Sequence, residues 1–155
     1  MNSSAISIVI GFFIGCVFGV GCALAVMNPI YIGGYSTLKF DSDSERRFAT
    51  ILEDDAEVVK WLKPPKDVLK IHYSDEENYN PDFIAETTSG RYLCEIKRAT
   101  DMDDSIVQKK AKAAIEWCER ATTVSDKPWK YALLPHDQIQ INRTFLSLMQ
   151  LLPQV

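Results

Sequence analysis

An uncharged apolar run near the N-terminus divides this 155-residue chain into two parts with different physical requirements. The residues from Ile6 to Met27 include no Asp, Glu, Lys or Arg. At about 1.5 Å of rise per residue, roughly 20 apolar residues cross the hydrocarbon core of a bilayer. We therefore expect one transmembrane helix within residues 1–27, followed by a linker over residues 28–40. Residues 41–155 remain for a separate folded domain, which is long enough to bury a core of its own.

Two other interpretations of this run stay open. The small residues at Ala23–Ala25 resemble a signal-peptide cleavage site, although no Lys or Arg precedes Lys39 and the run is long for a signal sequence. Alternatively, Met27 is a second start, or the chain is a fragment of a longer protein. If the run is an anchor, the basic residues that follow it place the C-terminal domain in the cytoplasm, tethered to the inner membrane.

Charge and cysteine content exclude some classes of site. The formal net charge is −4, so the chain has no general attraction to nucleic acid, and any such partner needs a local binding site. The four cysteines include no CxxC pair, which argues against a zinc site or a disulfide framework. We expect Cys94 and Cys118 to be reduced and buried.

Three helices are expected in the C-terminal domain. The capping sequence Ser42–Glu45 opens the first, which we expect to run to about Trp61, with Asp54–Asp55 as a potential break. Asp103-Asp104-Ser105 caps the second, which runs to about Thr122 with a stripe of small apolar residues on one face. The third is expected from about Asp137 to Leu152.

Four strands are expected between and after these helices. Alternating or apolar segments bounded by turn residues predict strands at Val68–Tyr73, Pro81–Glu86, Arg91–Lys97 and Trp129–Leu134. The element order is then αβββαβα. Because a helix joins the third strand to the fourth, the sequence predicts an α/β domain with a mixed sheet of about four strands flanked by helices.

The two central strands bring acidic side chains together if the turn between them has four residues. With Thr87–Gly90 as the turn, Glu86 pairs with Arg91, and Asp82 then lies directly opposite Glu95. Opposed residues of an antiparallel pair have Cβ atoms about 4.5–5.5 Å apart on one face of the sheet. Lys97 lies on the same face because side chains alternate with a period of two. A three-residue turn would separate the group.

Two carboxylates and an amine at this spacing suit a divalent cation. The two acids repel each other unless a cation lies between them. Mg²⁺ is typically held by one or two carboxylates, with water and phosphate oxygens as further ligands. Lys97 would then stabilise negative charge on an attacking oxygen or a phosphate. On spacing alone, an ordinary solvated ion pair remains the alternative.

The residues of this segment also resemble a known nuclease family. Pro81-Asp82, followed by Glu95-x-Lys97 in an αβββαβ order, resembles the core of the PD-(D/E)XK nucleases. Between Lys39 and Ile139, longer stretches resemble the C-terminal endonuclease region of type III restriction enzyme Res subunits. They are FDSDSERRFATILEDDAEVVKWLKP, YNPDFIAET, YLCEIKRATDMDD, KAAIEWCERA and KPWKYALLPHDQI. The resemblance implies a restriction-endonuclease-like fold.

The resemblance implies a role for each residue of the motif. Asp82 and Glu95 would be metal ligands, with the carbonyl of Ile96 as a third, and Lys97 would position or activate water. Two further residues are implied more loosely. Glu45 matches an acid that many family members carry on the first helix, and its alternative role is in the capping box with Ser42. Gln108 resembles a glutamine on the helix after the motif, although surface glutamines are common on helices.

The activity implied by the resemblance is Mg²⁺-dependent hydrolysis of DNA, with Mn²⁺ as an alternative ion, in restriction or defence. The sequence contains no GxxxxGK(S/T) phosphate loop, the motif that binds ATP in many motor proteins. It therefore implies no ATP-driven translocation. A separate helicase or methyltransferase subunit is therefore an expected partner. The alternative is a catalytically inactive remnant or interaction module that binds DNA or a partner subunit.

Overall fold

The computed structural model describes residues 39–65, 68–74 and 76–152. The predicted transmembrane segment Ile6–Met27 lies outside these residues. Within the described ranges, no helix is both long enough and apolar enough to cross a bilayer. The anchor, the linker over residues 28–40 and the orientation toward the cytoplasm therefore stay predictions.

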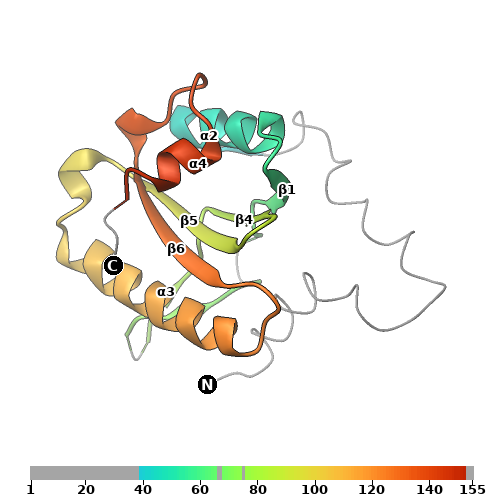
Figure 1. The fold of residues 1–155 in the computed structure, drawn as a ribbon. Helices are drawn as coiled ribbons and strands as arrows, with labels where there is room; N and C mark the ends of the chain where they lie inside the picture. The colour runs from blue at the N-terminus through green and yellow to red at the C-terminus, as the bar shows by residue number, and fades with distance from the viewer. Residues whose placement is uncertain (1–38, 66–67, 75, 153–155) are drawn as a thin grey trace.

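A four-stranded mixed sheet forms the centre of the domain (Figure 1). Its order is β1 (Val58–Leu62), β4 (Phe83–Thr87), β5 (Arg91–Lys97) and β6 (Trp129–Pro135). Strand β4 pairs antiparallel with β1 and with β5, whereas β5 and β6 are parallel. Helix α3 (Ser105–Thr123) makes the crossover that parallel pairing requires. The mixed α/β sheet predicted from the sequence is confirmed.

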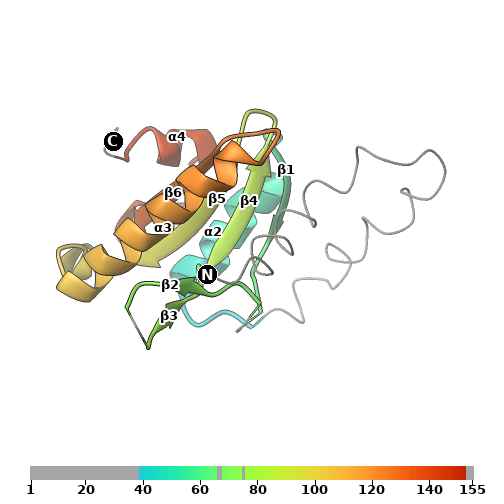
Figure 2. The same cartoon turned by 90° about the horizontal axis from the view of Figure 1, so that it is seen from below.

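Helices and a small hairpin cover the two faces of this sheet (Figures 1 and 2). Helices α2 (Asp43–Asp54) and α4 (Phe145–Met149) lie on one face, and α3 lies on the other with the hairpin of β2 (Ile71–His72) and β3 (Asn78–Tyr79). Because side chains alternate along a strand, Phe83 joins the first core cluster and Ile84 joins the second. Each face therefore has its own hydrophobic core.

Helix α2 begins where its capping sequence predicts but ends earlier. Ser42 is the N-cap, and its hydroxyl accepts the N–H of Glu45 at 3.2 Å. The helix ends at Asp54, and Asp55 is extended. The prediction that it continues to about Trp61 is wrong, because Val58–Leu62 instead forms β1 and pairs with β4. Sheet pairing and the strand preference of the adjacent valines outweigh the helical spacing of the apolar residues.

The predicted C-terminal helix over Asp137–Leu152 is also wrong. The structure has a short 3-10 helix at His136–Gln138 and the five-residue helix α4. Between them Ile139 is extended and only 1% exposed, because it is drawn into the first core cluster. Thr144 then starts α4 with a capping box formed with Ser147.

The segment before β4 differs from its prediction as well. The predicted strand Val68–Tyr73 is reduced to Ile71–His72, and the segment between it and the predicted strand Pro81–Glu86 contains β3. Ile71 pairs with Tyr79, and both are buried against α3 in the second core cluster. This packing fixes the chain directly before Pro81-Asp82.

Helix α3 agrees closely with its prediction. Asp104 is the N-cap and accepts the N–H groups of Ile106 and Val107. The predicted small-residue face is buried at Ala111, Ala114, Cys118 and Ala121. Cys94 and Cys118 are both free and buried, as expected.

Candidate active site

The turn that sets the register of the central hairpin has four residues, as predicted. The N–H of Thr87 donates to the Gly90 carbonyl at 2.8 Å, and the Thr87 hydroxyl accepts the N–H groups of Ser89 and Gly90. A Cβ at Gly90 would lie 3.3 Å from the Pro128 carbonyl oxygen, closer than most Cβ contacts. The close approach of two backbones at this turn therefore favours glycine.

The register that follows from this turn is also confirmed. Glu86 pairs with Arg91, and Phe83 pairs with Cys94. Asp82 is the residue before Phe83, and Glu95 is the residue after Cys94. The two acids therefore lie across from each other where β4 begins, on the face of the sheet that α3 and the β2–β3 hairpin cover.

Asp82 is held in place by the backbone of β5. Its Oδ2 accepts the N–H of Ile96 at 2.8 Å. Burial, and then the negative charge of Glu95, raise the pKa of Asp82 to about 7, although the Ile96 N–H and the charge of Lys97 act in the opposite direction. A buried acid beside a second acid is an arrangement that attracts a cation.

Glu95 lies almost entirely inside the protein. It is 4% exposed, and its Oε1 is 2.6 Å from Nζ of Lys97. Its Oε2 is buried and has no hydrogen-bond partner among the described residues. Burial alone would lower the pKa of Lys97. The hydrogen bond and the charge of Glu95 outweigh burial and raise this pKa above its usual value. Lys97 is therefore a charged partner of Glu95 that leaves one carboxylate oxygen open.

Glu45 approaches the same region from α2. It is 7% exposed, and its Oε2 lies 2.6 Å from Nζ of Lys63 and accepts the N–H of Asp41 at 3.2 Å. Ser42 caps Glu45 as the capping-box interpretation requires, but the return bond goes to Asp41 rather than to Ser42. Its charge also raises the pKa of Asp82, so Glu45 lies within electrostatic reach of the central acids.

Gln108 is placed differently from the other predicted site residues. Its side chain is exposed, and its amide donates to the Met102 carbonyl at 2.6 Å. This bond ties the start of α3 to the 3-10 helix Ala99–Asp101, which follows β5. Among the residues that the structure describes, no bond joins Gln108 to Asp82 or Glu95, so its role at the site stays a prediction.

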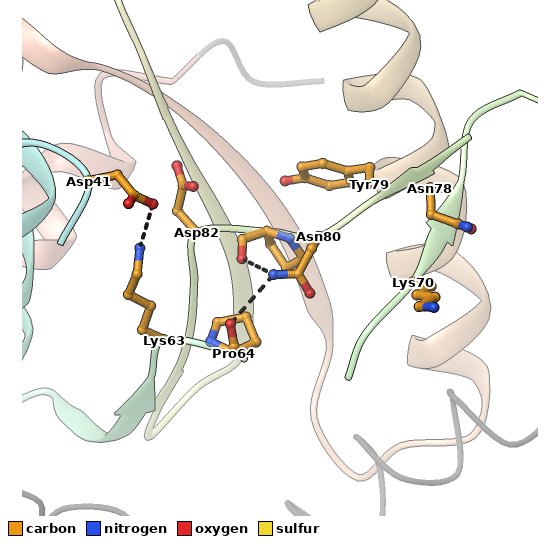
Figure 3. A pocket seen from close by; sticks show the side chains of 9 residues that line it. Asp41, Lys63, Pro64, Lys70, Asn78, Tyr79, Asn80 and Asp82 are labelled. Carbon is orange, nitrogen blue, oxygen red and sulfur yellow. Dashed lines mark hydrogen bonds and ion pairs between the residues drawn. The ribbon is translucent and has the colours of Figure 1, made fainter. Parts of the chain in front are cut away.

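A cavity of about 350 Å³ opens beside Asp82 (Figure 3). Nine residues line it: Asp41, Lys63, Pro64, Lys70, Asn78, Tyr79, Asn80, Pro81 and Asp82. Of these, sequence reasoning identified only Asp82 as part of a site. Lys63 follows β1, which was predicted as helix, and Tyr79 lies between two predicted strands, so neither was recognised. The only local signal was the position of Tyr79-Asn80 directly before Pro81-Asp82.

The site offers few side chains that could act as metal ligands. In the described ranges, no three side chains from His, Cys, Asp and Glu form a group arranged to hold a metal ion. The predicted ligands are two carboxylates and a carbonyl, and their oxygen chemistry matches hard divalent cations. The buried Oε2 of Glu95, which accepts no hydrogen bond from the residues that the structure describes, lies beside the buried carboxyl group of Asp82, and these oxygens fit such an ion.

A family model described as an endonuclease domain matches residues 33–125, more than half of the chain. The chain belongs to this endonuclease domain family. No curated protein and no solved structure matches it at a significant level. The match to the endonuclease domain includes both central acids, Lys97 and Glu45, whereas β6 and α4 lie beyond it. Nuclease activity is therefore the class of function that the family indicates.

Proposed function

We propose that this endonuclease domain is a metal-dependent endodeoxyribonuclease of the PD-(D/E)XK type, with Asp82, Glu95 and Lys97 as its catalytic residues. The observation that carries the proposal is the state of Glu95. One of its oxygens is paired with Lys97, and the other is buried across the hairpin from Asp82 with no hydrogen-bond partner in the described part of the chain. A purely structural ion pair has no need for a second buried acid at that position.

Asp82, Glu95 and the carbonyl of Ile96 would hold Mg²⁺, with Mn²⁺ as an alternative ion. When bound, such an ion supplies a Lewis acid for the phosphate and lowers the pKa of a coordinated water. The Ile96 N–H fixes one oxygen of Asp82, which leaves the other oxygen of that carboxylate for the ion. Two carboxylates with few other protein ligands are typical of Mg²⁺ sites that also bind substrate phosphate.

The charged side chains around these acids would act on the substrate. Lys97 lies 2.6 Å from Glu95 and is held charged there, so its ammonium group can donate to an attacking water or a phosphate oxygen. Glu45 holds Lys63 at the edge of the cavity. In this proposal Glu45 is an accessory acid that positions Lys63 and contributes negative charge near Asp82.

The biological setting is proposed from the resemblance to Res subunits of type III restriction enzymes. We propose that the substrate is DNA in a restriction or defence system. Because the sequence has no phosphate loop of the GxxxxGK(S/T) type, a separate helicase or methyltransferase subunit would supply or control access to DNA. Pull-down of the chain from its native cells, followed by identification of bound proteins, tests this part: a helicase or methyltransferase is expected among them.

The proposed location is the cytoplasmic side of the inner membrane, with residues 6–27 as the anchor. The support is the uncharged sequence of this run and the basic residues that follow it. Fractionation of cells that express the full chain should place it in the membrane pellet, and carbonate washing should not release it. Recovery of the full-length chain in the soluble fraction would contradict the anchor.

The activity is tested with the full chain, purified in mild detergent, on supercoiled plasmid with Mg²⁺. The variant Glu95→Gln keeps the shape of the side chain but removes its charge, and we expect it to cleave at least about 100-fold more slowly than wild type. Glu119→Gln is the matched control because Glu119 is exposed on α3, and it should cleave at the wild-type rate. Equal cleavage by wild type and Glu95→Gln, or none by wild type with Mg²⁺ or Mn²⁺, would refute the proposal.

A further inference from the structure

Lys63 places an ammonium group between two carboxylates and an aromatic ring. Its Nζ lies 2.6 Å from Oε2 of Glu45 and 3.9 Å from Oδ2 of Asp41. The backbone N–H of Asp41 donates to the same oxygen of Glu45 at 3.2 Å. Nζ of Lys63 also lies 5.4 Å from the centroid of the Phe83 ring, a distance at which the face of the ring attracts a cation. The surroundings of this ammonium group are therefore built for a positive charge.

This group of charges adjoins the proposed metal site. Lys63, Asp41 and Asp82 line the same cavity. In Figure 3 the ammonium group of Lys63 points toward Asp41, on the side of the cavity where the Asp82 carboxylate lies. The charge of Glu45 raises the pKa of both Asp82 and Lys97. Glu45 is therefore a third acid of the site, in addition to Asp82 and to the partner of Lys97.

Two of these three acids already have a cation from the chain itself. Glu95 is paired with Lys97 at 2.6 Å. Glu45 is paired with Lys63, also at 2.6 Å. Among the residues that the structure describes, Asp82 accepts a backbone N–H but forms no ion pair. Because a buried carboxylate needs a compensating charge, one of the three acids requires a cation from outside the chain.

We infer that Lys63 takes the place of a second metal ion beside Asp82, so that the site binds one divalent ion per chain. The inference deepens the proposed nuclease function and rests on it. In two-metal enzymes that hydrolyse phosphodiesters, two ions about 3.5–4 Å apart stabilise the attacking and the leaving oxygen. In this chain the ammonium group of Lys63 supplies the second positive charge.

The charges of the site balance with a single divalent ion. The three acids carry three negative charges when they are ionised, and Lys63 and Lys97 carry two positive charges. One Mg²⁺ and one phosphodiester group, which has a single negative charge, bring the total to zero. Asp41 is exposed, so water screens its charge. A second divalent ion would leave two positive charges without compensation in a largely buried site, which is unfavourable.

The test counts the ions that the full chain binds after purification in mild detergent. Mn²⁺ is the probe, because its free concentration is measured directly by electron paramagnetic resonance. Lys63→Met removes the ammonium group and keeps an apolar stem. Lys60→Met is the matched control: Lys60 lies on β1, its side chain is 17% exposed like that of Lys63, and it pairs with another buried acid, Glu86, at 3.4 Å.

We expect one Mn²⁺ per chain in wild type and in Lys60→Met. Lys63→Met should bind two, because the Glu45 carboxylate is then free to hold an ion beside Asp41. The double variant Glu45→Gln with Lys63→Met removes both charges of the pair, and its count should return to one. An ion pair with only a structural role predicts one ion in every variant.

Thermal unfolding keeps the test decisive if Lys63→Met folds poorly. In EDTA this variant should be less stable than wild type, since the buried Glu45 has lost its cation. Mg²⁺ should raise its stability by more than it raises that of wild type, because binding of a second ion adds to the gain. For Lys60→Met the gain from Mg²⁺ should equal that of wild type.

Several results would overturn the inference: two ions on wild type, one ion on Lys63→Met, two ions on the double variant, or no extra gain from Mg²⁺ in the stability of Lys63→Met. A wild-type chain that binds no Mn²⁺ refutes the proposed metal site and the inference together. A wild-type chain that binds one Mn²⁺ but cleaves no DNA refutes only the proposed nuclease, whereas the ion count of Lys63→Met still decides the role of Lys63.

Discussion

The Oδ2 atom of Asp82 accepts a hydrogen bond from the backbone N–H of Ile96 at 2.8 Å. This bond joins the residue before β4 to a residue near the end of β5, just beyond the last antiparallel pair, Phe83 with Cys94. The side chain of Asp82 thus continues the hydrogen bonding of the hairpin after the backbone ladder has ended. As a result, a buried acid is fixed beside Glu95, and several predictions depend on its charge.

Stability should fall as the pH rises through the range in which Asp82 ionises. The pKa of Asp82 is about 7 in the folded protein and 3.8 ordinarily. Between these values the folded state keeps a proton that the unfolded chain has released, so raising the pH favours unfolding. Urea denaturation in EDTA, followed by fluorescence of the buried tryptophans, should show lower stability at about pH 8 than at about pH 5. Asp82→Asn should reduce this difference, and an unchanged difference would contradict the assignment.

Mg²⁺ should stabilise the wild-type protein against unfolding, and more at about pH 8 than at about pH 5, because the ion competes with the proton on Asp82. At an ion concentration about 100 times the dissociation constant, the expected gain is about 2.7 kcal/mol. Thermal unfolding with and without Mg²⁺ measures it. Glu95→Gln and Asp82→Asn should lose most of the gain. A gain of the same size in both variants would place the ion elsewhere.

Replacing Lys97 by Met should abolish most cleavage per folded molecule, and it should also lower stability because the buried Glu95 carboxylate loses its cation. The change removes the ammonium group that lies 2.6 Å from Glu95 but keeps an apolar stem of similar length. Loss of a positioned charge that stabilises the transition state costs on the order of 100-fold or more in rate. Lys109→Met, at an exposed position on α3, is the control and should leave the rate unchanged. A wild-type rate for Lys97→Met would remove Lys97 from the mechanism.

Replacing Glu86 by Ala should destabilise the domain strongly without acting on the chemistry. Glu86 accepts from Arg91 at 3.0 Å and from Lys127 at 2.7 Å, at the turn end of the hairpin. Arg91 is 1% exposed, so removing its partner leaves a buried charge with less compensation, at a cost of about 3–5 kcal/mol.

The control for this prediction is Glu116→Ala, in an exposed helix ion pair, which should cost less than about 1 kcal/mol. Urea denaturation measures both. For Glu86→Ala, the cleavage rate per folded molecule should equal that of wild type. A lower rate per folded molecule would show that the network at the turn also acts on the site.

Local sequence patterns were sufficient to predict the structure wherever it depends on residues that are close together in the sequence. Ser42 and Asp104 marked the first residues of two helices because an N-cap acts on the N–H groups of the next turn. The four-residue turn at Thr87–Gly90 fixed the register that places Asp82 opposite Glu95, since side-chain parity follows from turn length. The sequence alone therefore determined the central hairpin, its two acids and the lysine beside them.

Tertiary packing decided the parts whose partners lie far away in the sequence. Val58–Leu62 has apolar residues at helical spacing, but it forms a strand because β4 offers a free edge for pairing. Tyr79 lies between two predicted strands, where the sequence predicts no element, yet it pairs with β2 and is buried against α3. Lys63 reaches Glu45 only because β1 lies beside α2. Such contacts depend on the pairing of whole elements, which the periodicity of one segment does not specify.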